Sequence, residues 1–535
     1  MIEKIMKAVK SNNKKRGRNI TVGAVVGMLL SCTIAMGAEI EEVAGLNITN
    51  DASGIKIDKV FPENTWNENT YINNTIISLD KTTGTENGVG VKIDGGSKET
   101  NLTFINNNMI LSKSSGGNAY GIKVENLGEN SKFNFINNGV ASGESSAFSY
   151  AGYGVCLKSL SGNDFIFENN SLISGKNSTG TGIGAYLGSI LGNNFTFVNN
   201  GIILGENSLN GKDPSGIYLN SISGNNFTFK NNGLISGKNS NGTGIGAMLW
   251  SNSGKNSTFE NNGTISGEGG NSTYKKGGGV WFYQNSDSGL TLENNGLISA
   301  KGYESYGIMV SDGTGAVVNS GVVYGKTNAI IKKTNGTLLS GANNYGILIS
   351  DSDDVISSGI TISTDSEDNK IGNYGLAFTV NSSGGYKNYD TVNTKGNFGS
   401  IYADVTIGET KYTIRNVQAT VDNSTGAITN VKSFKIENGK LHNDTTVIND
   451  GKATTDNIIL NGIENTLKVV GDNSGNSLSN AIINAYGTAV EFNGTSGGSL
   501  SLTNTTVNGG VKENTSAILG SSGADTLVLK NTVVN

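Results

Sequence analysis

The sequence predicts an all-β fold, a right-handed single-stranded parallel β-helix (solenoid) of about 30-residue rungs with three strands each. Three observations predict it: an Asn-Asn doublet at nearly constant spacing, short runs in which apolar and polar residues alternate, and Gly- and Asn-rich corners between those runs. Successive doublets are 31, 32, 30, 32, 30 and 33 residues apart. They are Asn106-Asn107, Asn137-Asn138, Asn169-Asn170, Asn199-Asn200, Asn231-Asn232, Asn261-Asn262 and Asn294-Asn295.

The first strand of each rung precedes the doublet and carries apolar residues four and two positions before it. Side chains alternate across a strand with period two, so both residues face one side, which we expect to be the core. The earlier positions hold Leu102, Phe133, Phe165, Phe195, Phe227, Ser257 and Leu290. The later positions hold Phe104, Phe135, Phe167, Phe197, Phe229, Phe259 and Leu292.

Two further short strands follow each doublet. The second strand has one inward residue: Ala141, Ile173, Ile203, Ile235, Ile265 or Ile298. The third is built on a Gly-aliphatic pair, and we expect one equivalent column in Gly121-Ile122, Gly154-Val155, Gly182-Ile183, Gly216-Ile217, Gly244-Ile245, Gly279-Val280, Gly307-Ile308, Gly346-Ile347 and Gly375-Leu376. The corners contain Gly, Asn and Ser, which suit sharp turns.

Three short strands cannot close a core alone, but identical neighbours stacked on them can. Equivalent positions would then lie about 4.8 Å apart, the strand spacing of a sheet. We therefore expect Phe227 to pack on Phe195 and Ile235 on Ile203. One of the two Asn columns is predicted to form a ladder of side-chain amides, as in other stacked β structures. The alternative is that Asn serves only as a turn residue, and the sequence does not say which Asn of each doublet forms the ladder.

The repeat divides the chain into five parts. Residues 1–37 are a signal peptide with an extended basic n-region, 38–85 an N-terminal cap and first rungs, and 86–380 the regular β-helix. Residues 381–440 are an irregular region or hairpin insertion, in which Ile401 to Asp422 alternate as antiparallel hairpins do, with Gly408-Glu409 as a turn. Residues 441–535 are further rungs with shorter corners, and the chain ends within them.

The leader joins seven basic residues to the apolar run Ile20 to Leu30, and Ala35 and Gly37 suit the positions before a signal-peptidase cleavage site. A membrane anchor is the alternative, but the run is shorter than the roughly 20 apolar residues that spanning requires. A second alternative is lipidation of Cys32, in the lipobox-like Leu29-Leu30-Ser31-Cys32. The sequence does not decide whether Cys32 is acylated. The rest of the chain is expected outside the inner membrane.

Composition and charge exclude some classes of protein. Only 35% of the 535 residues are hydrophobic, 77 are Gly and two are Pro, which predicts an ordered protein with a thin core. Residues 1–37 hold seven of the 39 basic residues and one of the 44 acidic ones, so the exported part has 32 basic and 43 acidic residues, or −11. This balance argues against binding nucleic acid. Only Cys156 remains after cleavage, so no intramolecular disulfide is possible.

Motifs with catalytic or metal-binding associations each have a simpler explanation. Gly494 to Gly498 match G-x-S-x-G around Ser496, but no helical pattern follows, as a nucleophile elbow requires. Gly242 to Ala247 resemble a dinucleotide fingerprint, yet the copy at Gly180 to Ala185 belongs to the repeat. Asp351-Ser352-Asp353-Asp354 lack the Gly and downstream Glu of an EF-hand loop. There is no Cys/His cluster for zinc.

A leader followed by hundreds of Gly/Asn/Ser/Thr-rich β-helical residues, with FxFxNNGxIxG as the recurring phrase, resembles the passenger region of autotransporters (type V secretion). The resemblance covers nearly the whole chain. Filamentous-haemagglutinin-like exoproteins share the style, but their secretion domain carries an Asn-Pro motif, and Pro62 and Pro214 are the only prolines here. Family members end in a membrane β-barrel, whereas this sequence ends at Asn535 inside a rung. The barrel is therefore expected to be truncated or encoded separately.

The resemblance implies an adhesin or self-associating protein at the cell surface, in the outer membrane or released. Its partners would be host surface or matrix glycoproteins and glycans, its own copies, and the outer-membrane assembly and export machinery. We predict no enzyme activity, no catalytic, cofactor or metal site, and no cofactor. Two alternatives stay open: a β-helical polysaccharide lyase or hydrolase, in which Arg415 and His442 would be required, and a structural stalk that displays another module. The ligand and the release of the passenger are undetermined.

Segments that depart from the repeat are the expected recognition elements, because loops on a rigid scaffold usually carry function. They are Ser145–Tyr153, Gly269–Gly279 and 381–440. Trp281, Phe282 and Tyr283 are candidates for presenting an aromatic ring to a sugar, although strand alternation buries at least one of them.

Overall fold

The computed structural model describes residues 46–535 with internal gaps. The gaps are 52–53, 58–64, 68, 82–83, 97–98, 208–212, 274, 284–289, 334, 364–366, 390–400, 408–409, 417–419, 422–426, 430–432, 438–439, 444–445, 448–453, 471–474 and 494–496. The leader 1–37, with Cys32, lies outside the described residues, as does Ser496.

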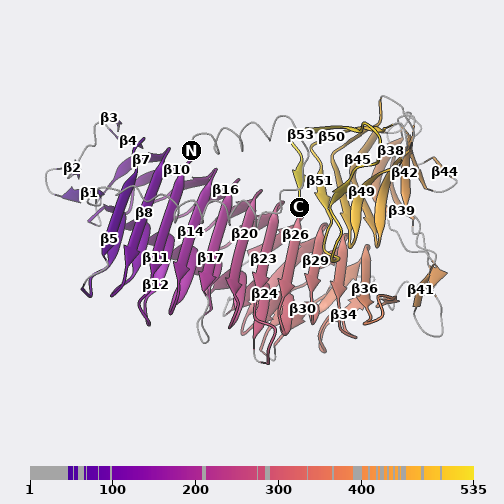
Figure 1. The fold of residues 1–535 in the computed structure, drawn as a ribbon, viewed down its shortest axis with the longest axis horizontal. Helices are drawn as coiled ribbons and strands as arrows, with labels where there is room; N and C mark the ends of the chain where they lie inside the picture. The colour runs from indigo at the N-terminus through magenta and orange to yellow at the C-terminus, as the bar shows by residue number, and fades with distance from the viewer. Residues whose placement is uncertain are drawn as a thin grey trace.

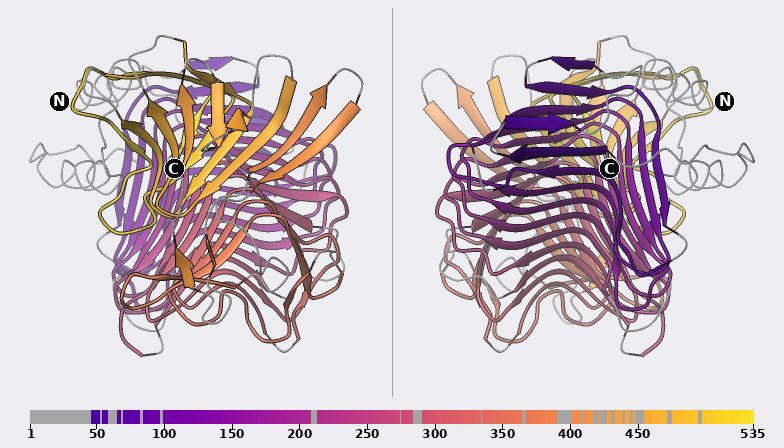
Figure 2. Two further views of the ribbon diagram at one scale, coloured as in Figure 1. Left: turned by 90° about the vertical axis from the view of Figure 1, so that its right-hand side faces the viewer. Right: turned by 90° about the vertical axis from the view of Figure 1, so that its left-hand side faces the viewer.

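The predicted all-β parallel solenoid is confirmed: three long sheets, here called A, B and C, run the length of a first solenoid (Figures 1 and 2). Sheet A contains, in spatial order, β2 (Gly54–Ile57), β1 (Leu46–Asp51), β6 (Gly88–Asp94), β9 (Ala119–Leu127), β12 (Ala151–Leu160), β15 (Thr181–Ile190), β18 (Ser215–Ile222), β21 (Gly244–Trp250), β24 (Lys276–Tyr283), β27 (Glu304–Ser311) and β30 (Asn328–Lys332).

Sheets B and C contain the other two strands of each rung. Sheet B is β3 (Thr65–Asn67), β4 (Thr70–Asn73), β7 (Asn101–Asn106), β10 (Lys132–Asn137), β13 (Ile166–Asn169), β16 (Thr196–Asn199), β19 (Thr228–Asn231), β22 (Ser257–Asn261), β25 (Leu290–Asn294), β28 (Thr314–Asn319), β32 (Asn343–Asn344), β35 (Lys370–Asn373) and β34 (Thr361–Ser363), with β31 (Thr337–Leu338) on β28. Sheet C is β5 (Ile77–Lys81), β8 (Met109–Ser114), β11 (Val140–Ser145), β14 (Leu172–Asn177), β17 (Ile202–Asn207), β20 (Leu234–Asn239), β23 (Thr264–Glu268), β26 (Leu297–Lys301), β29 (Val322–Gly325), β33 (Ile347–Ser350), β36 (Leu376–Val380), β37 (Tyr386–Asn388), β41 (Ala427–Thr429) and β40 (Thr420–Val421).

The core consists of columns of identical side chains, as predicted. Phe227 stacks on Phe195 with ring centroids 5.7 Å apart, and Ile235 lies beside Ile203 in the parallel register of β17 and β20. A second column of rings runs from Tyr71 through Phe104, Phe135, Phe167, Phe197 and Phe229 to Phe259, with centroids 4.3–5.8 Å apart. Each buried aromatic side chain removes roughly 150–250 Å² from water, which offsets the cost of ordering so many turn residues.

Both Asn columns form ladders, whereas the sequence predicted a ladder in only one. The first Asn of each doublet is buried and donates from Nδ2 to the Oδ1 of the next rung, at 2.6–2.9 Å from Asn73 to Asn373. The second Asn donates in the opposite direction, to the preceding rung, at 2.8–3.0 Å from Asn295 to Asn74. Both positions therefore contribute hydrogen bonds between rungs.

The predicted column of Gly-aliphatic pairs is partly wrong. Val155 lies in register with Ile122 and with Ala185, so Gly184-Ala185 replaces Gly182-Ile183, and Ala247 likewise replaces Ile245. At this position the backbone of sheet A approaches sheet C: a Cβ on Gly154 would lie 2.7 Å from the Ser174 nitrogen. Both glycines of the G-x-G sequence lie against sheet C, since a Cβ on Gly182 would lie 2.1 Å from the Glu206 carbonyl oxygen. The register of the paired strands, and not the close approach, shows that the second pair occupies the column.

The pairs Gly346-Ile347 and Gly375-Leu376 do not belong to this column either. Ile347 and Leu376 are in register with Val322 and lie in sheet C. Tyr345-Gly346 and Tyr374-Gly375 follow Asn344 and Asn373 of the inner ladder, so they occupy the corner after the Asn. A Gly before an aliphatic residue occurs at both corners of the rung, and for this reason the motif alone assigned these two pairs to the wrong strand.

A second, shorter solenoid follows the first. Its three sheets are β39 (Thr410–Asn416), β38 (Ile401–Ile407), β45 (Thr454–Gly462), β48 (Ala481–Ala485), β51 (Thr506–Asn508) and β54 (Val533–Val534); β44 (Thr446–Val447), β43 (Lys440–Asn443), β42 (Phe434–Glu437), β46 (Asn465–Val470), β49 (Thr488–Asn493) and β52 (Ile518–Leu519); and β47 (Ser477–Ser479), β50 (Ser499–Thr503) and β53 (Thr526–Lys530). Ile407 pairs with Thr410 in antiparallel register, as predicted for a hairpin over this segment, and the predicted turn residues Gly408-Glu409 lie outside the described residues.

The second solenoid lies back along the first with the opposite chain direction, beside β26 and β29 (Figure 1). Its own Asn ladder joins residues 23, 24 and 27 positions apart. The Nδ2 atoms of Asn461, Asn484, Asn508 and Asn535 also donate to the carbonyl oxygens of Tyr345, Ser320, Asn295 and Asn262, at 2.8–2.9 Å. One rung of the second solenoid thus faces one rung of the first.

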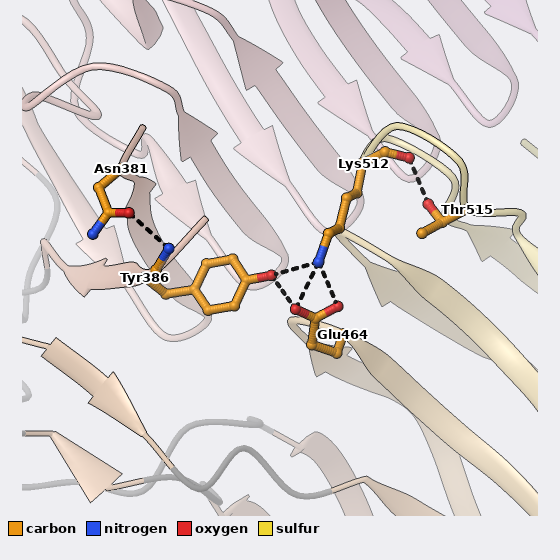
Figure 3. A network of polar contacts seen from close by, with 6 residues as sticks. Asn381, Tyr386, Glu464, Lys512 and Thr515 are labelled. Carbon is orange, nitrogen blue, oxygen red and sulfur yellow. Dashed lines mark hydrogen bonds and ion pairs between the residues drawn. The ribbon is translucent and has the colours of Figure 1, made fainter. Parts of the chain in front are cut away.

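A cluster of buried apolar side chains from both solenoids packs at the contact between them. Ile463, Tyr486 and Val511 of the second solenoid pack against outward side chains of β26, β29, β33 and β36. At its edge, Lys512 Nζ lies 2.8 and 2.9 Å from the two carboxylate oxygens of Glu464, and Tyr386 Oη donates to the same carboxylate (Figure 3).

Candidate binding site on the outer face of sheet A

The outer face of sheet A carries three columns of side chains in register across the rungs. The first column reads Tyr120, Tyr153, Ile183, Ser215, Ile245, Gly278 and Tyr306. The second reads Lys123, Cys156, Tyr186, Tyr218, Met248, Trp281 and Met309. The third reads Glu125, Lys158, Gly188, Asn220, Trp250, Tyr283 and Ser311. Large aromatic side chains occupy a different column at different rungs.

Six of these aromatic rings form a continuous diagonal row across the three columns. The row runs Tyr120, Tyr153, Tyr186, Tyr218, Trp250 and Tyr283, with successive ring centroids 4.9, 5.9, 5.5, 6.5 and 4.1 Å apart. The two terminal pairs are stacked and the three middle pairs meet edge to face. The row thus places an apolar surface with phenol groups on the outside of six consecutive rungs.

A hollow of about 440 Å³ opens beside the middle of this row. It exists because the first column shrinks from Tyr153 to Ile183 and then to Ser215, while the neighbouring columns keep Tyr218 and Trp250. Met248 completes the apolar part of the lining. Ser149, Tyr150, Thr181 and Asn118 come from the corners above the strands and make the rim polar.

One carboxylate, that of Asp213, lines the hollow among the described residues, and none of these lining residues is a Lys, Arg or His. Desolvation raises the pKa of the Asp213 carboxyl, and a hydrogen bond from Thr243 and the charge of Lys276 oppose this shift. Burial raises the pKa of the Tyr153 and Tyr218 phenols, so both hydroxyls stay protonated at neutral pH. The site therefore offers neutral hydroxyl and amide groups, apolar ring surface and one negative charge.

The predicted recognition segments differ in their contributions. Ser145–Tyr153 supplies Ser149, Tyr150 and Tyr153 to the hollow, and Phe148 beside it is 71% exposed. The described residues of Gly269–Gly279 do not line the hollow. For 381–440 only part of the segment is described; within that part, Tyr386 contacts the second solenoid.

Alternation within β24 separates the three candidate aromatic residues as expected. Phe282 points into the core, Trp281 is covered on the outer face, and Tyr283 is half-buried at the end of the aromatic row. The sequence did not identify Tyr186, Tyr218 and Trp250 as neighbours. Their row shifts from column to column, so no fixed position in the repeat is aromatic, and the sequence signal is an aromatic residue at the third strand of each of these six consecutive rungs.

Of the catalytic and metal candidates, Gly180 to Ala185 reaches this hollow through Thr181 and Ile183, as part of the sheet that lines it. Arg415 is on β39 and His442 on β43, which belong to different sheets. Gly180 to Ala185 and Gly242 to Ala247 lie at β15 and β21 in sheet A. Asp351 accepts a hydrogen bond from Tyr324 Oη at 2.6 Å, and burial raises the pKa of its carboxyl. In the described part of the chain, no three His, Cys, Asp or Glu residues gather as metal ligands would.

The thiol of Cys156 belongs to the second column and is buried. Desolvation raises its pKa to about 12, so almost no thiolate forms at neutral pH. The described residues also contain no helix with the length and hydrophobicity needed to cross a membrane.

Comparison with known proteins does not identify a family for this chain. No family model matches the chain, and neither a curated protein nor a solved structure does so.

Proposed function

We propose that this protein is a secreted or surface-displayed passenger of the autotransporter type that acts in adhesion or self-association through the outer face of sheet A. The observation that carries the proposal is the row of six aromatic rings on the outside of consecutive rungs, with a hollow at its middle. A partly exposed aromatic row is typical of surfaces that bind partners, because Tyr and Trp combine apolar area with a polar group.

The solenoid architecture supports the same proposal. Each rung contacts mainly its neighbours, so the fold is a rod that displays one face repeatedly along its length. Repeated contacts, each weak, become avid when many are made at once. The leader at 1–37 supports export, with the cell surface, the outer membrane or the extracellular medium as destinations and the outer-membrane assembly and export machinery as partners.

Adhesion can be tested with the purified protein on beads, by measuring binding to mucin-coated surfaces and bead-bead aggregation. A Tyr218→Ala/Trp250→Ala double variant should lose most of the binding, because it opens the middle of the row. Tyr374→Ala is the matched control: it also removes a stacked ring, but from the corner column formed with Tyr345. Equal loss in both variants, or none in the double variant, would contradict a role for the row.

The alternative of a polysaccharide lyase or hydrolase is tested with the same protein and pectin-like or host glycans. Release of fragments that stops in Arg415→Ala or His442→Ala variants would replace the adhesion proposal. A structural stalk would neither bind nor cleave.

A further inference from the structure

We infer that the hollow beside Tyr153, Tyr218 and Trp250 binds an uncharged sugar residue of a glycan chain, an inference that rests on the adhesion proposed above. Its volume of about 440 Å³ lies within the roughly 300–1,000 Å³ of small-ligand sites. The hollow is open along the face of sheet A, so a sugar within a longer chain can enter without its ends being buried.

The lining matches the two surfaces of a pyranose ring. One side of the hollow is apolar, formed by Ile183, Met248 and the rings of Tyr218 and Trp250. The Tyr218 and Trp250 rings meet edge to face with centroids 6.5 Å apart, so they line the hollow instead of closing on each other. The C–H faces of a sugar can pack on such rings.

The rim supplies partners for sugar hydroxyls. Ser149, Tyr150, Thr181 and Asn118 carry hydroxyl and amide groups at the corners, and the Asn118 Oδ1 is held in place by the Ala151 N–H at 2.7 Å. A site built to hydrogen-bond hydroxyl groups rejects ligands that lack them, because its polar groups would be desolvated without partners.

Charge selects among glycans. Among the described residues, Asp213 is the one carboxylate that lines the hollow, and no Lys, Arg or His lines it, although Lys276 acts on this carboxylate from nearby. We therefore expect uronic and sialic acids to be disfavoured relative to uncharged sugars. A small organic cation would find a carboxylate and aromatic rings, but it would leave most of the volume and the hydroxyl groups of the rim unused. The observations therefore favour an uncharged sugar.

The aromatic row provides the path for the rest of the chain. It continues from the hollow toward Tyr120 on one side and Tyr283 on the other, over rungs spaced about 4.8 Å apart. A glycan bound in the hollow can thus touch further rings along the rod.

The test uses the full chain on an array of uncharged, uronate-containing and sialylated oligosaccharides, with choline as a soluble competitor. Binding to uncharged glycans is expected, with Trp250→Ala weakening it by about tenfold or more, as for a central aromatic contact. Asp213→Asn should raise binding of acidic glycans relative to uncharged ones, because it removes the repelling charge.

A variant with a larger side chain in the hollow distinguishes loss of binding because the hollow is blocked from loss of binding because the protein is unfolded. Ser215→Tyr places in the first column the side chain that Tyr120, Tyr153 and Tyr306 already carry there. It should keep the thermal unfolding midpoint and abolish glycan binding. Full binding by Ser215→Tyr, preference for acidic glycans, competition by choline, or no binding to any uncharged glycan would each overturn the inference. If adhesion to mucin persists in that last case, the inference fails while the proposed function stands; if adhesion is also absent, both fail.

Discussion

Asn508 donates a hydrogen bond from Nδ2 to the backbone carbonyl of Asn295 at 2.9 Å, across 213 residues of sequence. The same Nδ2 donates to the Oδ1 of Asn484 at 2.7 Å, so one amide group both continues the ladder of its own solenoid and ties that solenoid to the other. Neighbouring rungs repeat this contact between an Asn amide and a backbone carbonyl. The same Asn residues therefore stabilise the stacking of rungs within the second solenoid and its contact with the first.

Tyr486 packs between the two solenoids, so we predict that shortening its side chain separates them. Tyr486 is 8% exposed and lies edge to face with Phe378 and Tyr386, at 6.1 and 6.2 Å between ring centroids. Tyr486→Ala should destabilise the docked arrangement by about 3 kcal/mol, as for other buried aromatic truncations. X-ray scattering would then show a larger radius of gyration. Leu519→Ala, on an exposed side chain of the same solenoid, is the control and should leave the radius unchanged.

The two Asn ladders differ in burial, so replacing an Asn of each ladder by Ala should lower the free energy of unfolding by different amounts. Asn199 is fully buried, donates to Asn231 and accepts from Asn169, both at 2.7 Å. Asn199→Ala leaves both neighbours short of a partner and should cost about 1–3 kcal/mol per buried polar group. Asn200→Ala removes an exposed ladder contact, where water replaces the lost bond, and should cost less than about 1 kcal/mol. Urea denaturation midpoints of the two variants would compare them, and equal shifts would contradict this reasoning.

Charges on the outer face of sheet C alternate in sign along one column. The column reads Asp80, Lys113, Glu144, Lys176, Glu206, Lys238, Glu268 and Lys301. A parallel stack of identical repeats would put like charges beside each other, and the alternation avoids this. A pairing that skipped one rung would bring two lysines or two glutamates together, so the column also disfavours that misalignment.

Reversing one charge in this column should therefore be destabilising. Lys176→Glu creates three consecutive glutamates and should lower stability by up to about 1 kcal/mol, since the groups are partly exposed to solvent. The thermal midpoint should recover as salt is raised, because exposed charges are screened. Lys176→Gln removes the charge without reversing it and should show a smaller loss with little dependence on salt. A salt-independent loss in Lys176→Glu would exclude repulsion as the cause.

The buried thiol of Cys156 predicts protection from alkylation. Its pKa is raised to about 12 from an ordinary value of 9.0, so at pH 8 the folded protein should react with iodoacetamide orders of magnitude more slowly than the unfolded chain. Between pH 9 and 12 the unfolded thiol loses its proton and the folded one keeps it, so stability should fall as pH rises through this window. Mass spectrometry of a Cys32→Ser variant would measure the reaction at Cys156 alone. Fast labelling of the folded protein would show that the thiol is accessible.

The repeat made much of the first solenoid predictable. Phe195 and Phe227 were expected to stack because a period of two within the strand and about 30 between strands leave one consistent arrangement. Ile183 was assigned to the wrong column because G-x-G offers two glycines, and Ile347 because Gly precedes an aliphatic residue at both corners of the rung. Only the register of the paired strands shows which pair occupies the column.

The sequence by itself determined the short strands of the first solenoid and the core columns of the first two strands of each rung, since these follow from local alternation and from the repeat length. The tertiary structure alone decided that both Asn columns bond, that the second solenoid lies back along the first, and that Tyr153, Tyr218 and Trp250 surround one hollow. Each of these depends on which outward side chains of different rungs or different solenoids meet in space. Outward positions are not required to repeat, because the core does not constrain them, so their neighbours cannot be read from the period of the chain.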